Sequence, residues 1–271
     1  MKTFSAKTHP GNREGENEDS TGWDDVENLW LVADGMGGHA SGQVASKIAK
    51  DVVLQKMSDS TLKEVILQAH EEIARQAAED AEQDGMGTTI VIAKIDDREL
   101  QVGWVGDSRL YLLRDSELRQ VTVDHTFVEL LREKASLTEQ EIRNHPNKNI
   151  LTQTLGHDLP VPSVCVEPLR KNDRILLCSD GLNDEIDDEQ IREILQQDKD
   201  ADAVCDDLIS AALDNGGRDN VSAIVIDYDG ESHPQAKAHG GRNESMVAPV
   251  LWGMLAGLLV VVLMVWFFDL G

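Results

Sequence analysis

The sequence contains few cysteines and few aromatic residues, and its basic side chains are half as numerous as its acidic ones. The three cysteines, Cys165, Cys178 and Cys205, form no C-x-x-C pair, and their number is odd. We interpret them as buried or idle thiols of a protein that works in a reducing compartment.

Positive charge is scarce, because 25 lysines and arginines stand against 50 aspartates and glutamates, for a formal net charge of -25. A field of this sign repels nucleic acid, so no nucleic-acid partner is expected. The acids are spread along the whole chain, and most of them are expected to form a solvated surface. A metal site would use only about five of them.

The N-terminus lacks the apolar segment of a signal peptide, and residues 246–268 lack charge altogether. As a helix with a rise of ~1.5 Å per residue, this segment would span roughly 34 Å, enough for a ~30 Å hydrocarbon core. Trp252 near one end and the aromatic residues 266–268 at the other are typical of membrane interfaces. The sequence therefore predicts one C-terminal transmembrane helix that anchors the protein in the cell membrane.

The charges beside this segment predict its orientation. Lys237 and Arg242 precede it, and Asp269 is the charged residue that follows it. The positive-inside rule then places residues 1–245 in the cytoplasm. We expect a single-pass protein whose folded part faces the cytoplasm.

The rest of the chain divides into a soluble unit, residues 1–229, and a polar linker, residues 230–245. Hydrophobic periodicity predicts strands at 28–33, 88–95, 99–105, 109–114, 118–123, 174–179 and 220–228, and helices at 41–57, 61–83, 126–143, 188–197 and 202–214. Strands and helices come in blocks, which indicates an α+β fold. Short turns between the strands from 88 to 123 favour antiparallel hairpins there.

The stretch LVADGMGGHASGQVAS, residues 31–46, is compatible with two kinds of ligand. Gly35-x-Gly37-x-x-Ala40 fits a dinucleotide-binding fingerprint that follows a strand and opens a helix. Asp34, however, would place a negative charge beside the bound pyrophosphate, and a second helical pattern follows where that fold needs a strand. A dinucleotide-binding module is therefore the weakest alternative.

Other carboxylates share the position of Asp34 beside the end of an apolar strand: Asp107, Asp180 and Asp219, together with Glu18 and Asp19 in the segment GENEDS. Hard cations such as Mg²⁺ and Mn²⁺ take oxygen ligands. If the fold gathers these strand ends, the mutual repulsion of the carboxylates requires cations there. We therefore expect a metal centre at this place.

The motif order NED, DGMGGH, GTT, GDSR, DHT, SDGL and DN resembles that of the metal-dependent Ser/Thr protein phosphatases of the 2C type, in their bacterial form. The resemblance covers residues 3–228. It implies a four-layer α-β-β-α sandwich, in which two antiparallel sheets are flanked by helices and two metal ions bind at one edge. It also implies a flap beside the site, formed by about residues 128–159.

The resemblance assigns the ligands of two metal ions. Asp34 is similar to the carboxylate that bridges both ions, and the carbonyl group of Gly35 would bind one of them. Glu18 resembles a ligand of the second ion. Asp180 and Asp219 resemble ligands of the first ion.

Three further residues receive roles from the same resemblance. Asp19 is similar to the acid that orients metal-bound water. Asp107 resembles the acid that, with Asp180, holds a third and weaker metal ion. Arg13 would bind the substrate phosphate, provided that one extra residue in its loop still presents it to the site.

By this resemblance the protein would be a phosphoprotein phosphatase that uses Mn²⁺ or Mg²⁺. Two ions ~4 Å apart would lower the pKa of a water molecule between them, and the hydroxide would attack the phosphorus of phosphoserine or phosphothreonine. The cysteines lack the Cys-x5-Arg loop of the cysteine phosphatases, so no phosphocysteine is expected. Phosphorylated proteins and a Ser/Thr kinase are the expected partners. A catalytically silent relative that acts as a scaffold or regulator is the alternative.

Overall fold

The structure is a computed structural model that describes residues 3–13, 15–37, 41–135, 138, 141 and 145–230. The expected transmembrane segment, residues 246–268, lies outside this part of the chain, and so does the expected linker apart from Gly230. No helix among the described residues is long and apolar enough to cross a membrane.

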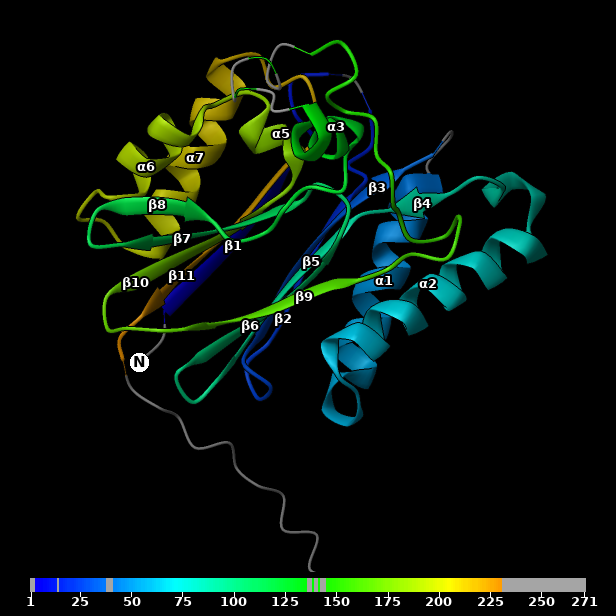
Figure 1. Cartoon of the computed structure of the whole chain (residues 1–271), viewed down its shortest axis with the longest axis horizontal. Helices are drawn as coiled ribbons and strands as arrows, with labels where there is room; N and C mark the ends of the chain where they lie inside the picture. The colour runs from blue at the N-terminus through cyan, green and yellow to red at the C-terminus, as the bar shows by residue number, and fades with distance from the viewer. Residues whose placement is uncertain are drawn as a thin grey trace, which may run out of the picture. The chain divides into compact units, whose positions relative to one another are not determined.

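Two antiparallel sheets form the centre of the fold (Figure 1). The first comprises β1 (Thr3–His9), β7 (Arg109–Arg114), β8 (Glu117–Gln120), β10 (Asp173–Cys178) and β11 (Val221–Tyr228), in the order β1-β11-β10-β7-β8. The second comprises β2 (Asp19–Asp24), β3 (Leu29–Met36), β5 (Ile90–Asp96), β6 (Glu99–Val105) and β9 (Ser163–Pro168), in the order β2-β3-β5-β6-β9. The short strand β4 (Gly87–Thr88) pairs with the end of β3.

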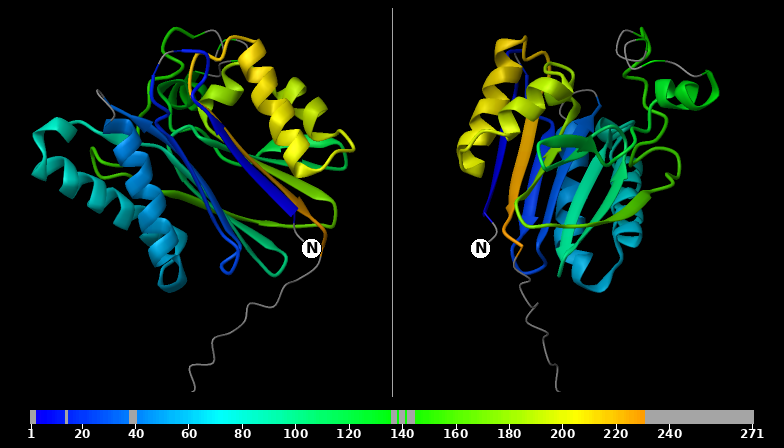
Figure 2. Two further views of the ribbon diagram at one scale, coloured as in Figure 1. Left: turned by 180° about the vertical axis from the view of Figure 1, so that it is seen from behind. Right: turned by 60° about the vertical axis from the view of Figure 1, so that its left-hand side comes forward.

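Helices cover the outer faces of both sheets (Figure 2). The helices α1 (Ser41–Lys56) and α2 (Leu62–Glu79) pack on the second sheet. The helices α5 (Asp180–Asn183), α6 (Asp188–Leu195) and α7 (Ala201–Asp214) pack on the first, and α3 (Phe127–Ala135) follows β8 along the chain. The expected α+β sandwich of two antiparallel sheets flanked by helices is confirmed.

Apolar side chains pack in three layers between these elements. Val32, Leu112 and Ile224 belong to the layer between the sheets. Leu31 points the other way, toward α1 and α2, because successive side chains of a strand face opposite sides of the sheet. Strands buried on both faces read as continuous apolar runs, which is why the central strands were predictable. All three cysteines are free thiols, and Cys178 is fully buried.

The expectations missed β1, β2 and β9, and all three are edge strands of their sheets. An edge strand pairs on one side only and carries more polar residues, as in the segment TFSAKTH of β1. Its hydrophobic pattern is therefore weaker than that of a central strand.

Several boundaries differ from the expected ones. β3 runs on to Met36, so Asp34 lies inside the strand and not in a turn after it. The helix expected at 126–143 is wrong as one element, because α3 ends at Ala135 and Thr138 forms a capping box with Glu141. A capping box marks the start of a helix. The helix expected at 61–83 ends at Glu79, and a separate 3-10 turn follows.

The connection from β6 to β7 is not the expected hairpin. β6 belongs to the second sheet and β7 to the first, so the chain crosses between the sheets at residues 106–108. This crossing places Asp107 at an edge where both sheets meet. The flap expected at 128–159 lies partly outside the described residues.

Candidate active site

The predicted carboxylates lie at one end of the two sheets. Asp19 begins β2 directly opposite Asp34 of β3. Asp180 follows the end of β10, and Asp219 precedes the start of β11 beside it. Neighbouring strands are antiparallel, so the end of one lies beside the start of the next. The charges of Asp19, Asp180 and Asp107 all act on Asp34, which shows that the two sheets bring them together.

A buried polar contact joins the sheets at this edge. The Oδ2 atom of Asp19 accepts hydrogen bonds from Ser222 Oγ at 2.6 Å and from Ser179 Oγ at 2.8 Å. Both serines belong to the first sheet or its continuation, whereas Asp19 belongs to the second. The Oδ1 atom of Asp19 is buried and has no hydrogen-bond partner among the described residues. Such an oxygen fits a metal-bound water as its partner.

The backbone of Glu18 holds its side chain in place. Its N–H donates to Asn220 Oδ1 at 2.7 Å, and its carbonyl oxygen accepts from Ser46 Oγ at 2.6 Å. Gly42, in the first turn of α1, lies against the Glu18 carboxylate. A Cβ atom on Gly42 would lie 2.8 Å from Glu18 Oε2, so the glycine leaves the room that the carboxylate occupies.

Asp180, expected beside the end of the strand at 174–179, is the first residue of the short helix α5. A Cβ atom on Gly181 would lie 2.0 Å from the carbonyl oxygen of Asn220, so α5 rests directly against the start of β11. This approach brings Asp180 beside Asp219. The carboxyl groups of Asp180 and Asp34 also act on each other, and the charge of Asp180 helps to raise the pKa of Asp34.

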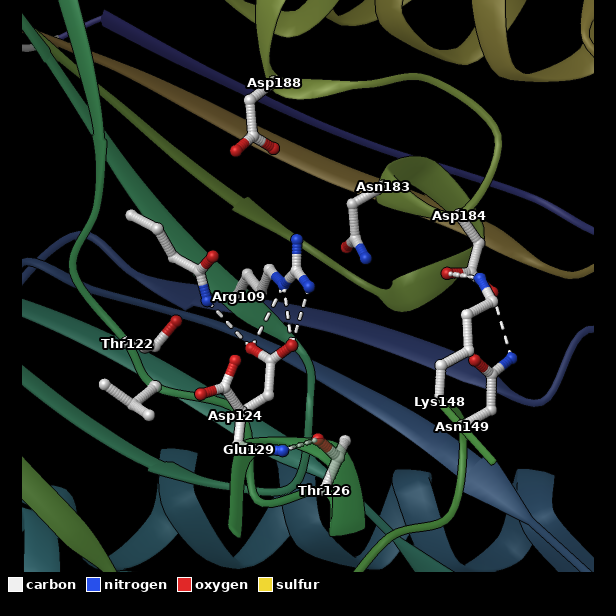
Figure 3. A network of polar contacts seen from close by, with 12 residues as sticks. Arg109, Thr122, Asp124, Thr126, Glu129, Lys148, Asn149, Asn183, Asp184 and Asp188 are labelled. Carbon is white, nitrogen blue, oxygen red and sulfur yellow. Dashed lines mark hydrogen bonds and ion pairs between the residues drawn. The ribbon is translucent and has the colours of Figure 1, made fainter. Parts of the chain in front are cut away.

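An ion pair joins Arg109 of β7 to Asp124, in the segment that follows β8 (Figure 3). Arg109 Nη2 lies 2.7 Å from Asp124 Oδ2, and Arg109 Nε lies 3.0 Å from the same oxygen. Arg109 Nη1 donates to the hydroxyl group of Tyr111 at 2.8 Å. The pair fixes Asp124 against the start of β7. Its partner Arg109 lies two residues after Asp107 in the sequence.

Two cavities flank the acidic edge and share the residues Lys148, Asn149, Asp180 and Asp184. The smaller, of about 160 Å³, is also lined by Arg109 and by the acids Asp107, Asp124 and Glu129. The larger, of about 280 Å³, is also lined by Arg13, Gly181, Glu185, Arg218 and Asp219. Lys148 and Asn149 both bind Asp184, at 2.7 and 3.0 Å (Figure 3). Arg13 therefore lies on the same side of the site as Asp219.

The carboxylates at this edge repel one another. Burial, followed by the charges of its neighbours, raises the pKa of Asp34 well above its usual range. Burial and neighbouring carboxylates raise the pKa of Asp180 to about 6. Burial raises the pKa of Asp19 to about 7, in spite of its two serine hydrogen bonds. Burial and the charge of Asp180 also raise the pKa of Asp107. Negative charge is thus concentrated where a cation would be stabilised.

Comparison with known proteins agrees with this chemistry. The family model described as "Protein phosphatase 2C" matches residues 12–225. The chain belongs to the protein phosphatase 2C family. The serine/threonine protein phosphatase PstP of Mycobacterium tuberculosis is 37% identical over 234 residues, which cover 82% of this chain but only 45% of PstP. The serine/threonine phosphatase stp of Listeria monocytogenes is 34% identical over 238 residues, which cover 82% of this chain and 94% of that protein.

A solved structure of the same family has the same architecture. The crystal structure of the catalytic domain of PstP in complex with two manganese ions matches with a TM-score of 0.76 and 34% sequence identity. The match covers 83% of this chain and 97% of that one. The dinucleotide alternative is wrong in its fold, because β3 pairs antiparallel with both β2 and β5, whereas that module needs parallel strands.

The acidic edge of this protein phosphatase 2C chain fits metal ions by its donor atoms. Within the described residues, no three Asp, Glu, His or Cys side chains are close enough together to form a ready set of ligands. The buried carboxylates of Asp34 and Asp180, whose charges act on each other, and the unpartnered oxygen of Asp19 nevertheless leave an excess of acceptor oxygens. Cations would be stabilised at this edge by these oxygens.

Sequence reasoning missed several residues that organise the site. Ser179 precedes Asp180 within the motif SDGL, so a local signal existed for it. Ser222 has no such signal, because only the packing of β11 against β2 of the other sheet brings it to Asp19. Thr88 holds the end of β3, since its Oγ1 donates to the carbonyl oxygen of Asp34 at 2.8 Å.

Proposed function

We propose that this protein is a protein-serine/threonine phosphatase that hydrolyses phosphoserine and phosphothreonine with bound Mn²⁺ or Mg²⁺. The observation that carries the proposal is the convergence of Asp34, Asp180 and Asp107, whose pKa values burial and mutual repulsion raise, at one edge of the sandwich. The names of the relatives and the two manganese ions of the related structure support the same activity.

Five residues would hold the two metal ions in this proposal. Asp34 would contribute to both ions, Glu18 to one of them, and Asp180 and Asp219 to the other. The carbonyl group of Gly35 would be a further ligand. The bound ions supply charge neutralisation for the phosphate group and a water molecule of lowered pKa.

The chain's own groups would orient the reactants. Asp19 orients water through its unpartnered Oδ1 atom, because the two serines fix Oδ2. Arg13, on the wall of the larger cavity, binds phosphate oxygens with its planar guanidinium group. Asp107 and Asp180 both line the smaller cavity and would together hold a third and weaker metal ion.

The test is phosphate release from a phosphothreonine peptide by the 271-residue protein, with Mn²⁺ and with EDTA. We expect release that depends on the metal. Tight binding of the peptide without release at saturating Mn²⁺ or Mg²⁺ would instead indicate a catalytically silent scaffold or regulator.

We further propose that residues 1–229 form the phosphatase domain, that 230–245 form a linker, and that 246–268 anchor the protein in the cell membrane with the domain in the cytoplasm. The support is the uncharged segment and the preceding Lys237 and Arg242. Anchoring would raise the effective concentration of membrane-bound substrates, such as a receptor-like Ser/Thr kinase.

Carbonate extraction of membranes tests the anchor, and protease added to spheroplasts tests the orientation. We expect the protein to stay with the membranes and its domain to stay uncut. A protein found only in the soluble fraction would contradict the anchor, and digestion from outside would contradict the orientation.

A further inference from the structure

We propose that Arg218 recognises an acidic side chain next to the phosphorylated residue of the substrate, so that the enzyme prefers phosphopeptides with acidic flanks. The inference rests on the proposed phosphatase function. Arg218 directly precedes Asp219 and lines the larger cavity together with Arg13 and Lys148. A peptide whose phosphate group reaches the acidic edge would therefore pass beside Arg218.

A buried carboxylate holds the guanidinium group of Arg218 in place. Arg218 Nε lies 2.8 Å from Glu185 Oε1, and Nη2 lies 3.1 Å from Glu185 Oε2. The side chain of Glu185 is 2% exposed, whereas that of Arg218 is 65% exposed. Nη1 of Arg218 makes no hydrogen bond within the part of the chain that the structure describes. The group is thus oriented in advance and keeps donors for a ligand, which lowers the entropic cost of binding an anion.

The larger cavity places Arg218 beside the position proposed for the phosphate group. The cavity is lined by the cations Arg13, Lys148 and Arg218 and by the acids Asp180, Asp184, Glu185 and Asp219. Asp180 and Asp219 are proposed metal ligands, and Asp184 and Glu185 are paired with Lys148 and Arg218. Arg13 lies near the same group, because its charge helps to lower the pKa of Glu185, after the larger effect of the Arg218 hydrogen bond. Within the described residues, Arg13 is thus the unpaired cation proposed for the phosphate group, and Arg218 is the exposed cation that lies beside it in the same cavity.

The same ion pair also shapes the loop before β11, which gives a structural alternative. Gly216 has a φ of +141°, and a Cβ atom there would lie 2.9 Å from Glu185 Oε2 and 3.5 Å from Arg218 Nε. Losing the pair could move Asp219 and slow every substrate equally. The experiment must therefore separate recognition of the peptide from support of the loop.

The test compares two phosphothreonine peptides of equal length, one with glutamates beside the phosphothreonine and one with glutamines in their place. For the wild type we expect kcat/KM to be about three- to ten-fold higher for the acidic peptide, the range of a charge-assisted contact at a partly exposed site. In Arg218→Ala this ratio falls to about one, chiefly because KM for the acidic peptide rises. Arg218→Lys keeps the charge and restores part of the ratio, and high salt weakens the preference in the wild type.

Arg75→Ala is the matched control. Arg75 on α2 is also exposed and paired with glutamates, Glu72 and Glu79, and it lines neither cavity. Arg75→Ala removes the same charge as Arg218→Ala and should leave the ratio of kcat/KM between the two peptides at its wild-type value. Equal losses on both peptides in Arg218→Ala, or no acidic preference in the wild type, would overturn the inference. Failure to hydrolyse either peptide would instead contradict the proposed function.

Discussion

Ser222 donates a 2.6 Å hydrogen bond to Asp19, and this contact ties β11 of the first sheet to β2 of the second. Between the sheets the packing is otherwise largely apolar, as Val32 and Ile224 illustrate. At the acidic edge, hydrogen bonds therefore set the relative position of the two sheets. The carboxylates that come from different sheets depend on this contact for their spacing.

Ser222→Ala should lower turnover by about 10- to 100-fold, the usual effect of removing a group that orients a metal-site residue. The free energy of unfolding should fall by about 1 kcal/mol, because Ser179 still donates to Asp19. Ser5→Ala is the control. Ser5 Oγ donates to Asp202 Oδ1 at 2.8 Å, and this contact lies outside the acidic edge. The control should lose similar stability and keep its turnover. Equal turnover in both variants would contradict a role for the Ser222 contact.

Asp34→Asn and Asp180→Asn should each lower turnover by at least about 100-fold while the fold stays intact. Each change removes a proposed metal ligand and one of the charges that repel each other at this edge. In EDTA, thermal unfolding should therefore occur at the same or a higher temperature than in the wild type. Asp25→Asn, an exposed position between β2 and β3, is the control. A folded Asp34→Asn variant with near wild-type turnover would exclude the proposed mechanism.

Asp107→Ala should lower turnover and raise the metal concentration needed for half-maximal activity. The reason is that Asp107 is proposed to hold a third ion, whereas the five residues proposed for the other two ions would be unchanged. Calorimetric titration with Mn²⁺ measures the sites directly. A wild type without a weak site would remove the basis of this prediction.

Asp124→Ala should lower the free energy of unfolding by about 3–5 kcal/mol, because it leaves Arg109 without its charged partner in a largely buried place. The double variant Arg109→Met with Asp124→Leu should be less unstable than the sum of the single variants. Breaking the exposed pair of Arg119 and Glu167 should change the free energy by at most about 1 kcal/mol. Urea unfolding of all variants measures these differences, and additive losses would show that Arg109 and Asp124 are not coupled.

His70 should make the wild type less stable in acid. It is buried on α2, and its Nδ1 accepts a 3.1 Å hydrogen bond from the N–H of Gly156. Burial lowers the pKa of His70, so the unfolded chain binds a proton more readily than the folded one. Stability is therefore complete above the unfolded pKa of about 6.5 and falls as the pH drops below it.

His70→Asn keeps an acceptor in place of Nδ1 but does not titrate. Between about pH 8 and pH 5.5, we expect the variant to lose less stability than the wild type in urea unfolding. His9→Asn is the control, because His9 Nδ1 accepts a similar bond from Gly11 at a less buried site. Identical pH dependence of His70→Asn and the wild type would contradict the prediction.

The sequence by itself determined the central strands, the main helices and the acids at the strand ends. Strands such as β10 and β11 are buried on both faces, so their residues are apolar without interruption and stand out in the chain. Helices such as α2 carry their capping box and apolar face within a short stretch. Such features depend on neighbours within one element, which a single sequence contains.

Only the tertiary structure decided how these pieces meet. The edge strands β1, β2 and β9 are extended because each pairs with a neighbouring strand, and their own sequences are too polar to predict a strand. The crossing of the chain at Asp107, the serine contacts of Asp19 and the pairing of Arg218 with Glu185 join residues that are distant in sequence or belong to different sheets. The distances between such residues depend on the register of neighbouring strands and on the packing between layers. Register and packing result from contacts between distant parts of the chain, which no local sequence pattern encodes.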